Sequence, residues 1–239
     1  MKITKNLSPN FSAKTRLKKG IKFIIIHYTG MQSEIESIYK LKNIRSKVSC
    51  HYLINRKGLV IQMVMDNKVA WHAGKSKWKN FVNLNEHSIG IELVNKGHEF
   101  GYQKFSKIQI SNLVKLCTNL KKKYKIQNEN FLGHSDIAPL RKIDPGEKFP
   151  WGKLSKYKLG HWYDQSEKKI TINKIKSIKN LFFKNLHKIG YRYFKINKRS
   201  KNDKLIIKSF QQHYDPQNVS GKIDKKTLII SYFLANGLK

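Results

Sequence analysis

The chain is poor in acidic residues, cysteine and proline, and these shortages narrow what it can be. Its 239 residues include 15 Asp and Glu, two cysteines and five prolines. Cys50 and Cys117 lie far apart and form no CxxC pair, which excludes a disulfide framework and a thiolate metal site. Glycine and proline are too few for a fibrous or low-complexity chain, so we expect a globular protein.

Long apolar runs are missing as well. No window approaches the ~20 apolar residues of a membrane-spanning helix. The opening residues 1–20 contain no apolar stretch of the length that a signal peptide needs. The sequence therefore favours a cytosolic protein without a transmembrane segment. A periplasmic or cell-wall location is the alternative, if export uses another route.

Basic residues greatly exceed acidic ones. The 49 Lys and Arg give a formal charge of +34, which solubility does not require and which suits a polyanionic partner. Nucleic acid, bacterial wall polymers and anionic membranes are candidates, although AT-rich coding produces a similar Lys-, Asn- and Ile-rich composition. Because no zinc-finger spacing or RNP-like aromatic pattern is present, we expect no specific nucleic-acid partner.

Segments with strand-like and helix-like patterns alternate in the first 130 residues. The patterns predict strands at 22–27, 50–55, 60–64 and 88–94, and helices at 33–41 and from a Ser106 cap onward. Such interleaving indicates an α/β (α+β) fold, with a central mixed β-sheet flanked by helices. We expect the proline-rich stretch 131–151 to be a long ordered loop.

Beyond about residue 160 the pattern is helical only. Apolar stripes that begin at Ile172, at Leu205 and after the cap residue Asp224 predict three short amphipathic helices. The sequence therefore predicts two domains, at 1–160 and 161–239.

Two histidines and an aspartate are the candidate metal ligands. His27 ends the first expected strand, and Asp144 precedes Pro145, whose ring favours extended geometry before it. With His134 they form a two-His-one-carboxylate set, which leaves one position of a catalytic zinc free for water. In an extended segment Lys142 would project to the same side as Asp144. Nine histidines make such arrangements easy to find, so spacing alone is a weak signal.

Five segments strengthen this prediction. They are FIIIHYTG, SCHYLINRKG, WHAGKS, NEHSIGIELVN and GHSDIAPLRKIDPGEKFPW. Their order and spacing resemble the zinc N-acetylmuramoyl-L-alanine amidases of the AmpD/AmiD type, over about residues 20–155. The resemblance implies one Zn²⁺ bound by His27, His134 and Asp144. It also implies hydrolysis of the amide bond between N-acetylmuramic acid, or its 1,6-anhydro form, and L-alanine in peptidoglycan or muropeptides.

The same resemblance assigns two catalytic residues. The glutamate of the family's SIGIE segment falls on Glu92, which would take a proton from the attacking water. The family's lysine falls on Lys142, which would stabilise the oxyanion. From the residues alone, a solvated strand carboxylate and one more surface lysine are the simpler interpretations. Leu140 departs from the family, where glycine is common, and this bears on loop shape.

The roles of two further histidines stay open at this stage. His51 and His72 could contact substrate or orient a metal ligand, and a structural histidine is an equal alternative for each. Trp71 and Trp78 could stack on sugar or pack in the core.

The C-terminal segment resembles the three-helix peptidoglycan-binding module of AmiD-type amidases. The similarity rests on IGY at 189–191, KSFQQHY at 208–214 and GKIDKKT at 221–227. It implies a zinc amidase domain at 1–160 and a peptidoglycan-binding-like domain at 161–239, although a generic helical bundle would show the same stripes. The alternative function is a non-catalytic peptidoglycan-recognition protein, against which the retained ligands and Glu92 argue.

Overall fold

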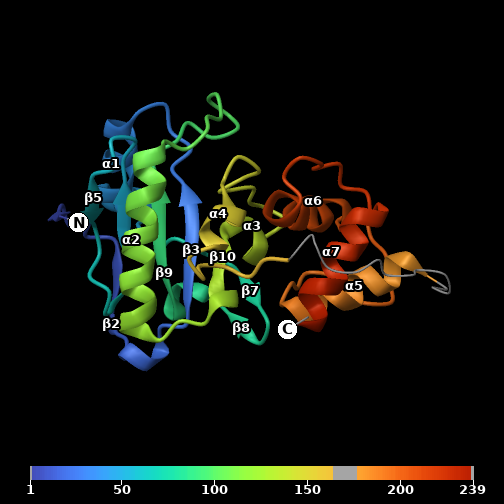
Figure 1. The fold of residues 1–239 in the computed structure, drawn as a ribbon. Coiled ribbons are helices and arrows are strands. Elements are labelled where there is room, and N and C mark those ends of the chain that lie inside the picture. Colours follow the sequence, from blue (N-terminus) through green and yellow to red (C-terminus); the bar gives the residue numbers. More distant parts are fainter. Residues whose placement is uncertain (1, 164–176, 238–239) are drawn as a thin grey trace.

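A six-stranded mixed sheet organises the N-terminal part of the chain, and a bundle of helices lies beside it (Figure 1). The computed structural model describes residues 2–163 and 177–237. The strand order is β1-β5-β4-β9-β3-β10. Strands β4 and β5 are antiparallel, whereas β3 runs parallel to both β9 and β10. The predicted fold class, a mixed sheet flanked by helices, is confirmed.

The elements are short apart from one long helix. The sheet contains β1 (Ile3–Lys5), β5 (Val60–Gln62), β4 (Tyr52–Ile54), β9 (Ser88–Leu93), β3 (Phe23–Tyr28) and β10 (Phe131–Gly133). Two ribbons pair β2 (Phe11–Thr15) with β6 (Lys68–Ala70), and β7 (Lys77–Trp78) with β8 (Phe81–Val82). The α-helices are α1 (Glu34–Lys42), α2 (Lys107–Tyr124), α3 (His134–Ile137), α4 (Trp151–Ser155), α5 (Ile178–Ile189), α6 (Asp203–Tyr214) and α7 (Lys225–Asn236).

Alternation along the two central strands decides which face of the sheet carries polar side chains. On β3, Ile24 and Ile26 belong to the core beneath α2, so His27 points to the opposite face. The apolar residues of β9 lie in that same core, which leaves Glu92 on the face that carries His27. The strand register pairs Glu92 directly with His27. The polar face is therefore the one that α2 does not cover.

A second apolar core lies on the same face of the sheet as His27 and Glu92, and it joins the helical bundle to the sheet. It unites Phe23 and Ile25 of β3 and Leu132 of β10 with Phe182 of α5 and Phe210 of α6. The bundle lies beside the sheet (Figure 1), and both contribute side chains to this one core. In the part of the chain that the structure describes, no helix is long and apolar enough to cross a membrane.

Most elements with a clear period occur where the sequence predicts them. The four predicted strands are β3, β4, β5 and β9, and the predicted helices begin with side-chain caps at Ser33 and Ser106. The stretch 131–151 was wrongly expected to be a loop throughout, since it contains β10, α3 and the start of α4, which are too short to show a period. Ile172 and Ile175 lie outside the described residues, and α5 begins at Ile178.

Candidate metal centre and cleft

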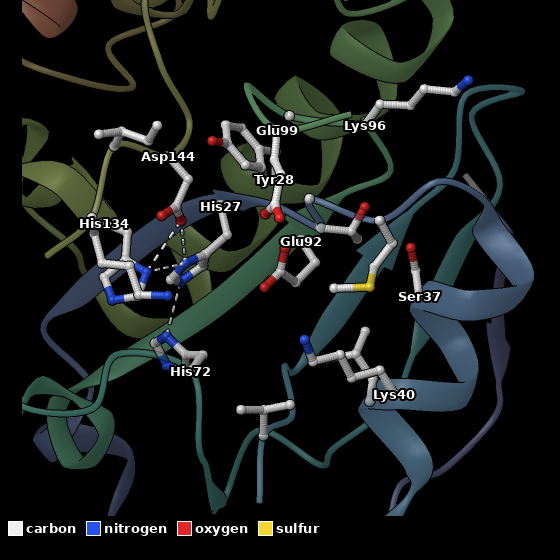
Figure 2. A pocket seen from close by; sticks show the side chains of 18 of the residues that line it. His27, Tyr28, Ser37, Lys40, His72, Glu92, Lys96, Glu99, His134 and Asp144 are labelled. Carbon is white, nitrogen blue, oxygen red and sulfur yellow. Dashed lines mark hydrogen bonds and ion pairs between the residues drawn. The ribbon is translucent and has the colours of Figure 1, made fainter. Parts of the chain in front are cut away.

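His27, His134 and Asp144 converge although 117 residues separate the first from the last. Nδ1 of His27 lies 3.0 Å from Nδ1 of His134 and 3.0 Å from Oδ2 of Asp144, and the latter two atoms are 3.1 Å apart. All three side chains are buried. Figure 2 shows them pointing toward one common point.

This triangle of donor atoms fits a divalent metal. Ligand atoms of a tetrahedral centre, at ~2.0–2.1 Å from the metal, lie roughly 3.3 Å from one another. Two imidazole nitrogens can share a hydrogen bond only if one carries a proton, and the single oxygen Oδ2 faces both of them. A cation at the centre would instead satisfy all three lone pairs together. The same three residues are the potential metal-binding group among the described residues.

The local fold explains how each ligand reaches the site. His27 lies near the carboxyl end of β3, and His134 follows β10, whose Gly133 pairs with Ile26 of β3. The two imidazoles therefore leave neighbouring parallel strands at the same edge. The backbone N–H of Ser135 donates to the carbonyl of Asp144 at 2.9 Å, which ties the third ligand to the segment of the second.

Burial and neighbouring charges set the protonation of the ligands. Burial, reinforced by the charge of His134, lowers the pKa of His27 to about 4, although Asp144 acts in the opposite direction. Burial alone would raise the pKa of Asp144, but His134 and His27 hold it well below its ordinary value. At neutral pH the site therefore offers a neutral imidazole and a carboxylate, which are the protonation states that bind a metal.

A chain of buried hydrogen bonds begins at Nε2 of His27, the ring nitrogen that does not face the other two ligands, and orients the ring. Nε2 of His27 lies 3.0 Å from Nδ1 of His72, and Nε2 of His72 lies 3.2 Å from Oγ of Ser88, which donates to the carbonyl of Leu84. Burial lowers the pKa of His72 well below its ordinary value, so this ring is neutral. If each Nε2 carries the proton, every donor in the chain finds an acceptor, and Nδ1 of His27 is left with its lone pair facing the metal position.

A glycine makes this chain sterically feasible. Gly90 lies on β9 between Ser88 and Glu92, and a Cβ at this position would come within 2.3 Å of the His72 ring. The His72 ring therefore lies against the bare backbone of β9. The sequence pattern SIGIE contains a glycine at this position because His72 could not otherwise reach His27.

A parallel arrangement supports His134. Its Nε2 lies 3.1 Å from the carbonyl of Ala73, which also accepts a hydrogen bond from Arg141. Arg141 further donates to the carbonyl of Lys75 at 2.9 Å. The guanidinium thereby holds the 73–75 turn against the metal centre. Arg141 was not among the candidate site residues, although it lies in the GHSDIAPLRKIDPGEKFPW segment directly before Lys142.

Glu92 lies beside the metal ligands, and its surroundings raise the pKa of its carboxyl group. Its Oε2 is enclosed and has no hydrogen-bond partner among the described residues. Burial, reinforced by the charge of Asp144, raises the pKa of Glu92 to about 8, although Lys142 and Lys40 act in the opposite direction. A carboxyl group whose pKa lies near neutrality suits proton transfer.

A cleft of about 400 Å³ opens over these groups. Lys142, His72 and Trp71 line it. Figure 2 shows Lys40 reaching into the cleft from α1, on the side opposite the metal ligands. Further lining residues that sequence reasoning did not single out are Tyr28, Lys40, Lys96, His98, Glu99, Arg141 and Ile143. The basic side chains suit a substrate that carries carboxylates.

The sequence left the roles of His51 and Trp78 open, and the structure places both side chains in the protein interior. His51 is fully buried and does not line the cleft; its Nδ1 accepts from the N–H of Gly90 at 3.0 Å. Trp78 is buried as well, and it packs edge-on against Tyr191. Both residues thus support the framework, and neither lines the cleft.

The sequence is similar to one family of known amidases. Residues 17–147 match the family described as N-acetylmuramoyl-L-alanine amidase. The chain is 32% identical over 226 residues to the N-acetylmuramoyl-L-alanine amidase AmiD of Escherichia coli strain K12, which covers 88% of this chain and 81% of that protein.

Solved structures show the same likeness. A complex of E. coli AmiD with anhydro-N-acetylmuramic acid-L-Ala-D-gamma-Glu-L-Lys has a TM-score of 0.79 and 30% identity, covering 95% of this chain and 92% of that chain. AmpDh3 from Pseudomonas aeruginosa gives a TM-score of 0.81 and 28% identity, covering 96% and 97% of the two chains. At this coverage the likeness includes most of the helical bundle.

Replacing Gly90 by alanine should displace His72 and thereby weaken metal binding. Loss of a residue that orients a ligand typically reduces metal affinity about 10–100-fold, and we expect a loss of this size for Gly90→Ala. Chelator competition on purified protein measures it. Gly20→Ala is the matched control, because a Cβ at Gly20 meets nothing within 4 Å. Equal metal affinities of the two variants would contradict the role given to the Gly90 backbone.

Proposed function

The chain belongs to the N-acetylmuramoyl-L-alanine amidase family, and we propose that it acts through one zinc ion held by His27, His134 and Asp144. It is a hydrolase that cuts the amide bond between N-acetylmuramic acid and L-alanine. The observation that carries the metal proposal is the triangle of donor atoms about 3 Å apart beside Glu92. Two imidazoles and a carboxylate are a typical ligand set of catalytic zinc.

The roles of the surrounding residues follow from their positions. A bound zinc ion would supply a Lewis acid and an activated water. Glu92 accepts a proton from the attacking water and returns it to the departing alanine nitrogen. The ammonium group of Lys142 stabilises negative charge on the lactyl oxygen as the tetrahedral centre forms. His72 positions His27, whereas His51 braces β9 beneath Gly90.

The cleft supports a muropeptide as substrate. The AmiD structure holds an anhydro-muramoyl peptide with L-Ala, D-gamma-Glu and L-Lys, and we propose the same class of ligand for this chain. The stem peptide carries carboxylates, and Lys40 and Lys96 line the cleft away from the metal ligands. These two ammonium groups are suitable partners for the carboxylates of the stem.

We further propose that the helical bundle binds wall polymer through a basic groove. This groove of about 570 Å³ is lined by Lys77, Arg192, Tyr193, Phe194, Lys195, Lys198, Arg199 and Ser200. Five of these eight residues are Lys or Arg, against 49 in the 239-residue chain, so the groove concentrates positive charge. Carboxylate-bearing wall strands suit it, and attachment to a polymer raises the local concentration of substrate.

Replacing Glu92 by glutamine should slow turnover strongly without removing the metal. Mass spectrometry of products from intact sacculi and from anhydro-muropeptides is the measurement, with EDTA treatment and zinc readdition as the metal test. Loss of a general base typically costs about 10²–10⁴-fold in rate, which we expect for Glu92→Gln. Unchanged activity of Glu92→Gln would remove Glu92 as the base.

The same measurement on the wild-type protein separates two places of action. Turnover of fragments alone would match recycling in the cytosol, and turnover of sacculi would match work on the wall.

The raised pKa of Glu92 also predicts a stability cost. Because its pKa in the folded chain is about 8 against an ordinary 4.5, ionisation favours the unfolded chain, and the free energy of unfolding falls between these pH values. Glu92→Gln removes this loss. We expect the melting temperature of the metal-free variant to match wild type at pH 4.5 and to exceed it by at least about 2 °C at pH 8.

The control for this experiment is Glu99→Gln, which removes a negative charge from the exposed rim of the cleft. Thermal unfolding at both pH values gives the comparison. A Glu92→Gln advantage that is the same at both pH values would contradict the buried-carboxyl explanation.

Reversing charge in the groove should release the protein from the wall. The double variant Lys195→Glu and Lys198→Glu is expected to cosediment less with purified sacculi, while hydrolysis of small muropeptides stays unchanged. The control Lys18→Glu with Lys19→Glu makes the same charge change at exposed residues of the sheet domain. Equal losses in both variants would attribute wall binding to net charge and not to the groove.

A further inference from the structure

A buried carboxylate lies two residues beyond the metal ligand His134. Asp136 is fully buried, and no Lys or Arg pairs with it in the described part of the chain. Its Oδ2 accepts from the N–H of Gly133 at 2.7 Å and from Nδ1 of His213 at 2.7 Å. Its Oδ1 accepts from the hydroxyl of Tyr191. Two of its three donors therefore come from the helical bundle.

A second link ties the bundle to the next peptide group. The hydroxyl of Ser209 on α6 donates to the carbonyl of Ser135 at 2.8 Å. The N–H of that same Ser135 donates to the carbonyl of Asp144 at 2.9 Å. One peptide segment thus connects α6 with the segments of two metal ligands.

The His213 ring is fixed so that it can meet Asp136. It stacks on Trp151 of α4, with ring centroids 3.9 Å apart and planes 13° apart. Its Nε2 is buried and has no hydrogen-bond partner among the described residues, so the ring is held through its faces and through Nδ1. Since a buried carboxylate is costly unless donors surround it, Asp136 keeps this position only while the bundle supplies them.

The ligands differ in their dependence on the bundle. His27 lies on a central strand of the sheet and is oriented by His72 of the same domain. His134 is the first residue of the four-residue helix α3, too short to be stable by itself, and its neighbours on the C-terminal side are bound by Ser209 and His213.

We infer that the helical bundle is a positioning element of the metal centre. His213, Tyr191 and Ser209 hold Asp136 and Ser135, and through them they keep His134 and Asp144 at coordination distance from His27. This inference rests on the metal role proposed for those three ligands. It gives the bundle a task in catalysis that is separate from binding wall polymer.

Variants that remove single donors test this inference. Tyr191→Phe removes the hydroxyl and keeps the ring that packs on Trp78, and His213→Phe keeps a ring to stack on Trp151. His213→Asn is the conservative variant, because its amide nitrogen can occupy the place of Nδ1. Ser231→Ala is the matched control: it breaks the buried hydrogen bond from Asn185 inside the bundle and touches no residue of the α3 segment.

The readouts are the zinc dissociation constant from chelator competition, kcat and KM on a muropeptide, and thermal unfolding of the metal-free protein. We expect Tyr191→Phe and His213→Phe to bind zinc at least about 10-fold more weakly and to lose kcat with KM unchanged. His213→Asn should recover most of the zinc affinity. Ser231→Ala should unfold at a lower temperature and bind zinc as wild type does.

Zinc affinities of Tyr191→Phe and His213→Phe equal to that of Ser231→Ala would overturn the inference. If His213→Phe does not fold, Tyr191→Phe decides by the same comparison, because it deletes a single oxygen. A wild-type protein that binds no divalent metal would overturn the proposed function instead, so the two failures are distinct.

Discussion

Three electron-rich atoms held about 3 Å apart in a buried site are the constraint on which the rest of this structure depends. Without a cation, neighbouring lone pairs of two imidazoles and a carboxylate repel one another, so the surrounding protein has to hold them in place. Each ligand accordingly has its own support. His27 is held by His72, His134 by the carbonyl of Ala73, and Asp144 by the N–H of Ser135.

Burial lowers the pKa values of the histidines of the site and raises the pKa of its glutamate, and both shifts suit the chemistry of the site. It lowers the pKa of His27 and His72, which keeps these imidazoles neutral and able to bind a metal or share a single proton. It raises the pKa of Glu92 to about 8, which brings a carboxyl group into the range where it can both accept and return a proton. A metal dication beside Glu92 would shift its equilibrium back toward the carboxylate.

The bundle and the sheet domain form one mechanical unit around the metal centre. A shared apolar core brings α5 and α6 against β3 and β10, and polar contacts from α6 and from Tyr191 end on the α3 segment. Gly190 shows how close the approach is, because a Cβ there would lie 2.4 Å from Trp78 of β7. The same bundle presents a basic groove on its surface. In our proposals, wall binding and the support of the metal ligands both involve this one small group of helices.

The sequence by itself determined four strands of the sheet, the long helix and the identity of the candidate ligands. Strand periodicity placed His27 at the end of β3 and Glu92 on a face away from large apolar side chains, because side-chain direction alternates along a strand. The GHSD and IDPG segments identified His134 and Asp144 through family resemblance. The short elements β10 and α3 escaped prediction, since three or four residues show no period.

Only the tertiary structure decided what holds these ligands. Gly90 is required because the His72 ring, 18 residues earlier in the chain, lies against it, and no local pattern records that contact. The KSFQQHY segment contains His213 but gives no sign of its partner, and His213 meets Asp136 across 77 residues. Such roles arise from packing between distant segments, so they become visible only when the sheet and the bundle are brought together.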